Sequence, residues 1–256
     1  MQASQTEPRR EQEGGIKDNY LSQLEADFQL LTEIIFSQMS LTLKLMSSED
    51  NPETFSELKR NEKIIDSLDI TIKEKVINAI IFFTPRAVDL RKLMAYHDMT
   101  ISMERVGDLI QNIAESIQKI DFSINGFDVY KKTIDKMLSK TNNMLKNAIF
   151  AFSGNNHEIA YYTILMDDKV DKMDRKMEKK LAEGFEGKTH SGQELVNIMN
   201  LHTISYYIER IGDKAVDIAE SAIYLIEGKD IRHDKAAKKS GGMQASRQEE
   251  KDGGDE

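Results

Sequence analysis

An internal repeat constrains the fold of this chain more than any other sequence feature. The segment Glu104–Ser116 recurs at Glu209–Ser221, with eight of 13 positions identical. Both copies open with Glu-Arg-(Val/Ile)-Gly-Asp and close with Ile-Ala-Glu-Ser, and they lie 105 residues apart. The same offset relates acids outside this segment, because it carries Glu62, Asp66 and Asp69 onto Asp167, Asp171 and Asp174. The repeat therefore predicts one acidic helical unit built twice.

Hydrophobic periodicity predicts that this unit is a bundle of three helices. Apolar residues recur every three or four positions, which is the helix period, and we find no notable β-type alternation. We expect helices from about residue 24 to 46, 53 to 83, 85 to 121, 130 to 152, 158 to 185 and 193 to 227. Thr84 is expected to cap the third helix, with Pro85 in its first turn. The predicted fold class is all-α, with six long antiparallel helices in two tandem three-helix bundles.

Polar ends and a central break suggest the domain boundaries. The two ends of the chain are polar, punctuated by glycine and without periodicity, which is typical of disordered tails. The segment 123–127 interrupts the helical pattern between the two halves. We therefore expect a tail at 1–17, a first bundle at 18–124, a second bundle at 125–230 and a tail at 231–256.

Composition excludes several classes of function. The 256 residues contain no cysteine, so disulfides, thiolate zinc sites and a cysteine nucleophile are excluded, and an intracellular location fits. With 44 acidic residues against 35 basic ones, the chain is a poor candidate for binding nucleic acid. The longest apolar run, 79–83, is far shorter than the roughly 20 residues of a membrane helix. Residues 1–20 contain no signal-peptide-like apolar stretch. We expect a cytoplasmic protein that meets membranes only through its partners.

The repeated acids could form two metal-binding grooves. On a helical wheel, Glu104 and Asp108 lie opposite the apolar stripe, as do Glu209 and Asp213, which predicts an outer face. Like charges four residues apart destabilise a helix by a few tenths of a kcal/mol, so acids stacked on two neighbouring helices favour a compensating cation. Carboxylate oxygens suit Mg²⁺, Ca²⁺, Mn²⁺ or iron. A solvated helix face is the alternative interpretation.

Three further residues flank the acids in each half. His97 and His202 are candidate nitrogen ligands or simply exposed histidines beside acids. Gly107 and Gly212 cost helix stability. Each glycine therefore either opens the groove or allows tight helix packing. The adjacent residues Arg105 and Arg210 balance charge, fix a carboxylate or bind an anion.

These motifs resemble one known family. The two Glu-Arg-(Val/Ile)-Gly-Asp segments, Asp89-Leu-Arg91 after Pro85, and Asp167-Asp-Lys-Val-Asp171 are similar to the PhoU family of phosphate-signalling proteins, over about residues 19–228. The resemblance implies metal clusters on these motifs, with iron expected and manganese, zinc or magnesium as alternatives. It assigns Glu62, Asp66, Glu104 and Asp108 to a first cluster, and Asp167, Asp171, Glu209 and Asp213 to a second. At Asn61-Glu62 the chain departs from the family pattern, in which an Asp is common, so occupancy of the first cluster stays open.

The resemblance also implies a function. Proteins of this family act as adaptors rather than enzymes, coupling a phosphate ABC transporter, through its ATPase component, to a sensor histidine kinase. The expected role is negative control of phosphate uptake and of the phosphate-starvation response, and we also expect a homodimer. The alternatives are a regulatory module of a sodium–phosphate cotransporter, a di-metal carboxylate enzyme and a metal-free scaffold. The enzyme is disfavoured because none of the five histidines follows a Glu by three residues.

Overall fold

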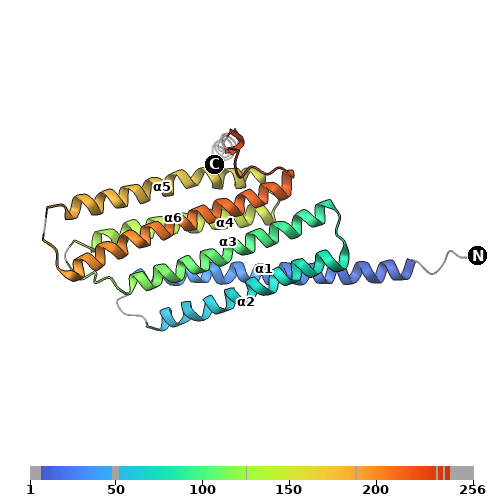
Figure 1. The fold of residues 1–256 in the computed structure, drawn as a ribbon, viewed down its shortest axis with the longest axis horizontal. Coiled ribbons are helices and arrows are strands. Elements are labelled where there is room, and N and C mark those ends of the chain that lie inside the picture. The colour runs from blue at the N-terminus through green and yellow to red at the C-terminus, as the bar shows by residue number, and fades with distance from the viewer. Residues whose placement is uncertain are drawn as a thin grey trace, which may run out of the picture.

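The protein is a pair of three-helix bundles. The computed structural model describes residues 7–47, 52–124, 126–187, 189–234, 236–238 and 240–242, and the described residues contain no β-strand. The first bundle consists of α1 (Glu7–Ser47), α2 (Pro52–Phe83) and α3 (Ala87–Ile117). The second consists of α4 (Asp128–Ser153), α5 (His157–Phe185) and α6 (Gly192–Glu227). The predicted all-α fold with two tandem bundles is confirmed (Figure 1).

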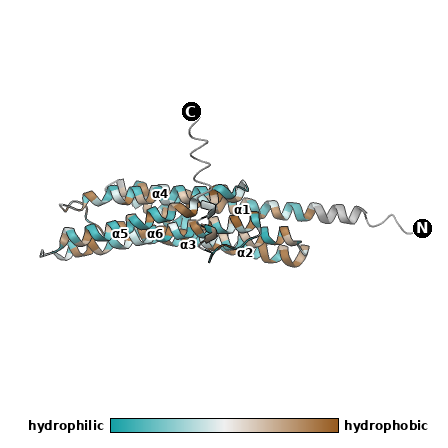
Figure 2. Ribbon diagram, turned by 90° about the horizontal axis from the view of Figure 1, so that it is seen from above, coloured by the Kyte–Doolittle hydropathy of each residue, from teal (hydrophilic) through white to brown (hydrophobic). Residues whose placement is uncertain are grey.

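The two bundles share one hydrophobic core. Helices α3 and α6 pack along each other at the centre, and α1 also contacts α4 (Figure 1). Apolar and polar residues are interspersed along every helix, as the hydropathy colours of Figure 2 show, so each helix has an apolar side to bury. Aromatic rings cross the junction: Tyr96 of α3 contacts both Phe28 of α1 and Phe152 of α4 edge-on. The bundles are therefore joined by packing rather than by the linker alone.

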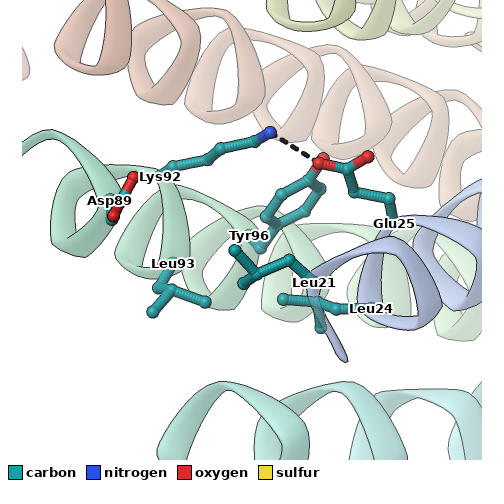
Figure 3. Close-up of a pocket in the computed structure, with 7 residues that line it drawn as sticks. All are labelled: Leu21, Leu24, Glu25, Asp89, Lys92, Leu93 and Tyr96. Atoms are coloured by element: carbon teal, nitrogen blue, oxygen red, sulfur yellow. Dashed lines mark hydrogen bonds and ion pairs between the residues drawn. The ribbon is translucent and has the colours of Figure 1, made fainter. Parts of the chain in front are cut away.

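An ion pair fixes α1 against α3 beside this aromatic contact. The Lys92 ammonium group of α3 donates to the Glu25 carboxylate of α1 at 2.5 Å, next to the ring of Tyr96 (Figure 3). Further towards the start of α1, Lys17 donates to Asp89 of α3, also at 2.5 Å. These contacts hold the N-terminal half of α1 against α3.

Two expectations about the helix ends were wrong. Thr84 does not cap α3; its φ of 41° is left-handed, and Pro85 lies before the helix. The residue before a proline is disfavoured in the α conformation, which keeps Thr84 out of the helix, and α3 begins at Ala87, after Arg86. The tail expected at 1–17 is helical from Glu7 onward, as part of α1.

The C-terminal tail expected from residue 231 is also partly ordered. Ile231 is fully buried, and Ala237 packs against the core. The remaining tail residues, 1–6 and 243–256, lie outside the described part of the chain. Among the described helices, none combines the length and the apolarity that crossing a membrane requires.

Candidate metal centres

The structure brings the predicted acids together at two helix–helix seams, one between α2 and α3 and one between α5 and α6, and we call these seams the first and the second groove. In the first groove, the carboxylate of Glu62 on α2 interacts electrostatically with those of Asp66 and of Asp108 on α3. The carboxylate of Glu104 interacts in the same way with those of Asp108 and Asp69. The second groove repeats this arrangement: Asp167 of α5 feels Asp171, Asp213 and Glu209. We call these sets the first cluster (Glu62, Asp66, Glu104 and Asp108) and the second cluster (Asp167, Asp171, Glu209 and Asp213).

The acids of α3 and α6 are not on the outer face that the helical wheel predicted. Glu104 and Glu209 are half-buried at the edge of the core. The wheel failed because α3 and α6 are the central helices, each packed against helices of its own bundle and against the other bundle. Their buried arc is therefore wide and reaches the acidic positions.

The second cluster contains carboxylate oxygens that lack partners. Asp167 Oδ1 and Glu209 Oε2 are buried and accept no hydrogen bond from any described residue. Burial raises the pKa of Asp167 to about 7, and the neighbouring charges of Asp171 and Asp213 add to the effect. Burial also raises the pKa of Glu209 to about 7, with Asp213 and Asp171 as the next causes. Buried, unpaired carboxylates are costly, so this groove favours a cation or a proton.

The electrostatic repulsion in the first cluster favours a bound cation less strongly than that in the second cluster. Burial raises the pKa of both Glu62 and Glu104, but Asp66 is exposed. A cation of the chain is also close, since the Lys73 ammonium group lies 2.7 Å from Asp69 Oδ1. The offset of 105 places Glu178 where the first half has Lys73. The second groove therefore lacks the counterpart of this lysine.

The counterpart of Asp69, Asp174, has a hydrogen bond in place of an ion pair with a lysine. Asp174 Oδ1 accepts a hydrogen bond of 2.7 Å from the Ser205 hydroxyl of α6. Neither Lys73 nor Ser205 was predicted from the sequence to be part of the grooves. The repeat offers a signal for Lys73, because a charge that changes sign between equivalent positions marks a difference between two otherwise similar sites.

The paired glycines and arginines have distinct roles. A Cβ at Gly107 would lie 3.2 Å from Ile65 Cδ1, so this glycine permits tight packing of α3 on α2. At Gly212 it would lie 3.3 Å from Asp167 Oδ1, so this glycine makes room for a carboxylate of the second cluster. The guanidinium groups of Arg105 and Arg210 fix Asp108 and Asp213 at 3.1 and 2.8 Å.

The histidines take other partners. His97 Nδ1 lies 3.3 Å from Asp98, and His202 Nδ1 lies 3.7 Å from Glu178. Across the described residues, no three carboxylate or histidine side chains are arranged so that they could hold one metal ion as they stand. The grooves thus concentrate acids without presenting a finished coordination site.

A duplicated three-helix bundle with an acidic groove in each half defines a class of all-helical, two-domain proteins. The PhoU domain profile matches residues 28–117 and 134–222, which together make up most of the chain. The chain belongs to the PhoU family.

Relatives with established names carry the same family designation. The phosphate-specific transport system accessory protein PhoU homolog 1 of Methanothermobacter thermautotrophicus is 28% identical over 210 residues, covering 80% of this chain and 92% of the relative. The PhoU homolog of Clostridium acetobutylicum is 30% identical over 173 residues, covering 67% of this chain and 77% of the relative. The chain thus belongs to a family named for phosphate transport.

Solved structures share the fold. The crystal structure of PhoU from Pseudomonas aeruginosa superposes with a TM-score of 0.73 at 20% identity, covering 83% of this chain and 99% of that one. The phosphate transport system regulatory protein PhoU from Streptococcus pneumoniae gives a TM-score of 0.74 at 20% identity, with 84% and 98% covered. At these identities the likeness concerns the architecture alone.

Proposed function

We propose that this protein is a metal-binding cytoplasmic adaptor that restrains phosphate uptake and the phosphate-starvation response. It acts by binding rather than by catalysis, and its partners are the ATPase component of a phosphate ABC transporter, a sensor histidine kinase, or both. Family membership supports the link to phosphate transport, since its relatives are named as accessory proteins of that system. A homodimer is part of the proposal.

The second cluster carries the metal-binding part of the proposal. The observation behind it is that Asp167 Oδ1 and Glu209 Oε2 are buried without a hydrogen-bond partner among the described residues. This donor set of oxygens suits a hard cation, with iron first and manganese, zinc or magnesium as alternatives. Asp167, Asp171, Glu209 and Asp213 would hold it, after side-chain rotation has drawn them together. The bound charge would neutralise carboxylates that burial otherwise penalises.

The proposed role of the metal is to fix the shape of the α5–α6 surface. Arg210 already restrains Asp213, and Ser205 restrains Asp174. A cation that joins Asp167 and Asp171 of α5 to Glu209 and Asp213 of α6 would tie the two helices together. Because such a ligand binds the folded state, it would also stabilise the protein by mass action.

Binding measurements on the full chain test this function. The purified ATPase component and the cytoplasmic part of the kinase are each immobilised, and the metal-loaded and metal-free forms of the protein are passed over them. The proposal expects at least one partner to bind, more tightly to the metal-loaded form. A variant with Asp167→Asn and Glu209→Gln should bind as weakly as metal-free protein. The matched control carries Glu62→Gln and Glu104→Gln in the first cluster.

Absence of binding to both partners would contradict the adaptor role, and equal affinity of the loaded and free forms would contradict the role of the metal.

A further inference from the structure

The segment after α6, residues 229–242, is described at 229–234, 236–238 and 240–242, and these residues fold back onto the outside of the second bundle. It lies beyond the PhoU domain match, which ends at residue 222. In Figure 1 its described part is the red turn of helix beside α5. Ile231 is fully buried and Ala237 contacts the core, so the segment is docked onto α5 and α6.

A buried ion pair anchors this segment. The Lys238 ammonium group contacts the carboxylate of Glu220 on α6, whose side chain is only 5% exposed. The equivalent acid of the first half is Glu115, which instead accepts a hydrogen bond of 3.1 Å from Gln111 of its own helix and is only partly buried. The two copies of the same acid therefore differ in what covers them, and the cover in the second half is the C-terminal segment.

Two glycines bring the backbone of the segment against α5. A Cβ at Gly241 would lie 2.4 Å from the ring of Tyr161, and a Cβ at Gly242 would lie 2.5 Å from Leu165 Cγ. Any other residue would clash, so the fit depends on glycine. The first half has Ser56 and Arg60 at the positions equivalent to Tyr161 and Leu165, and these two side chains hydrogen-bond to each other. The apolar seat on α5 exists in one half only.

We propose that residues 229–242 are an autoinhibitory clasp, and that the surface under it is a docking site for a basic segment of a partner protein. The surface is formed by Tyr161, Leu165 and Glu220. In the isolated chain the clasp covers this surface. When the clasp leaves, a partner segment that contains lysine and glycine binds in its place.

The charges around the seat favour such a partner. Glu158 and Glu227 lie around Tyr161, whose hydroxyl donates to Glu227 at 3.4 Å, and Asp217 acts on Glu220. A cationic segment complements this acidic border, as Lys238 already does. This inference goes beyond the proposed function and requires no metal.

Thiol labelling of the full chain tests the clasp. Because the protein contains no cysteine, Leu165→Cys provides a single reporter under the clasp, and Arg60→Cys provides the equivalent reporter in the uncovered half. The rate of reaction with a thiol reagent is measured for each. In the Leu165→Cys background, Lys238→Glu and, separately, Gly241→Val should raise the rate about tenfold or more, because each breaks a close contact of the docked state. The matched control is Lys132→Glu, the same charge change at an exposed position of α4.

A peptide arm tests the docking site itself. A synthetic peptide with the sequence of residues 229–242 is added to the Leu165→Cys, Lys238→Glu protein. It should restore slow labelling, whereas the same peptide with Glu in place of Lys238 should not. Equal labelling rates in the Lys238→Glu, Gly241→Val and Lys132→Glu proteins would overturn the clasp. Faster labelling that the peptide does not reverse would overturn the docking site. Neither result depends on metal or on the phosphate partners, so the clasp can fail while the adaptor function stands.

Discussion

The unpaired carboxylates of Asp167 and Glu209 make the second groove unstable by itself. Both groups are held between helices, close to Asp171 and Asp213, and burial is the main reason that each has a pKa of about 7. In the metal-free protein they must therefore either keep a proton or pay the electrostatic cost of repulsion. This property of single residues links folding stability to pH.

Stability of the metal-free protein should fall as the pH rises. The folded-state pKa of both groups is raised above the ordinary values of 3.8 and 4.5. The folded state therefore binds more protons, and the stability from these groups is fully present below the ordinary values and lost as the pH rises through about 7. We expect the urea midpoint of chelator-treated protein to be higher at about pH 5 than at about pH 8. The variant with Asp167→Asn and Glu209→Gln should lose most of this difference.

Other acids with shifted pKa values also contribute to the pH dependence of stability. Glu62 and Glu104 also have raised pKa values, so a smaller slope of the same sign should survive in the variant. Asp230 has a pKa lowered to about 2 by hydrogen bonds from Arg232, and it affects stability only in more acidic solution. A midpoint that rises between about pH 5 and about pH 8 in metal-free wild type would contradict the assignment.

Among the elements, α6 has the best-defined start. The Ser191 hydroxyl accepts a hydrogen bond from the Glu194 amide at 3.2 Å, and the Glu194 carboxylate accepts one from the Ser191 amide at 2.7 Å. This reciprocal pair is a capping box. It fixes the start of the helix that carries Glu209 and Asp213.

Removing this cap should destabilise the protein. Ser191→Ala leaves the Glu194 amide without its acceptor and should lower the free energy of unfolding by about 1 kcal/mol. Ser191→Thr keeps a hydroxyl and serves as the control. Chemical denaturation at one fixed pH measures both. Equal losses for the two variants, or none for Ser191→Ala, would mean that the hydroxyl does not cap α6.

Element positions could be predicted well, because the breaks between helices carry local signals. Pro52, Gly154 and Gly228 lie at or next to helix ends, and five of the six helices begin and end within a few residues of expectation. The docking of α1 at Lys17 and of the C-terminal segment at Lys238 was missed because both depend on tertiary contacts. Lys17 reaches Asp89, and Lys238 reaches Glu220, across separations that periodicity within one segment does not register.

The candidate sites were predictable in part for a related reason. The repeat identified which acids share a groove, because the same offset of 105 residues relates the acids of α2 to those of α5 and the acids of α3 to those of α6. Burial was not predictable from one wheel, because it depends on how many neighbours a helix has. The helical wheel that places Glu104 therefore predicted the buried face of α3 as if α6 did not pack against that helix. Lys73 was missed because the repeat draws attention to residues that both halves share, whereas Lys73 and Glu178 differ.

At the scale of the whole molecule, the two halves are unequal copies. The first groove contains Lys73, and the second has Glu178 at the equivalent position. A fixed ammonium group repels a second cation, so the two grooves should differ in their demand for metal. The duplication thus provides a strong groove and a weak one in the same chain.

Exchanging this one charge should reverse the inequality. Glu178→Lys should weaken metal binding by the second cluster by about tenfold, which is the size of effect seen for groups just outside a metal site. Lys73→Glu should strengthen binding by the first cluster. Titration calorimetry with Mn²⁺ on both variants and on wild type measures the change. Lys179→Glu, on the exposed side of α5, is the control for net charge alone. Unchanged affinities in both exchange variants would contradict the asymmetry.

The most direct test of the account is the metal content of the intact protein. Tag-free wild type, purified without chelators, is analysed by inductively coupled plasma mass spectrometry. Two variants are measured beside it, each changing the four acids of one cluster to Asn or Gln. The account predicts bound iron, manganese or zinc in wild type, most of it lost when Asp167, Asp171, Glu209 and Asp213 are changed and less lost with the first cluster. Wild-type protein that holds no metal, even after reloading, would contradict it and leave the acids as solvated helix faces.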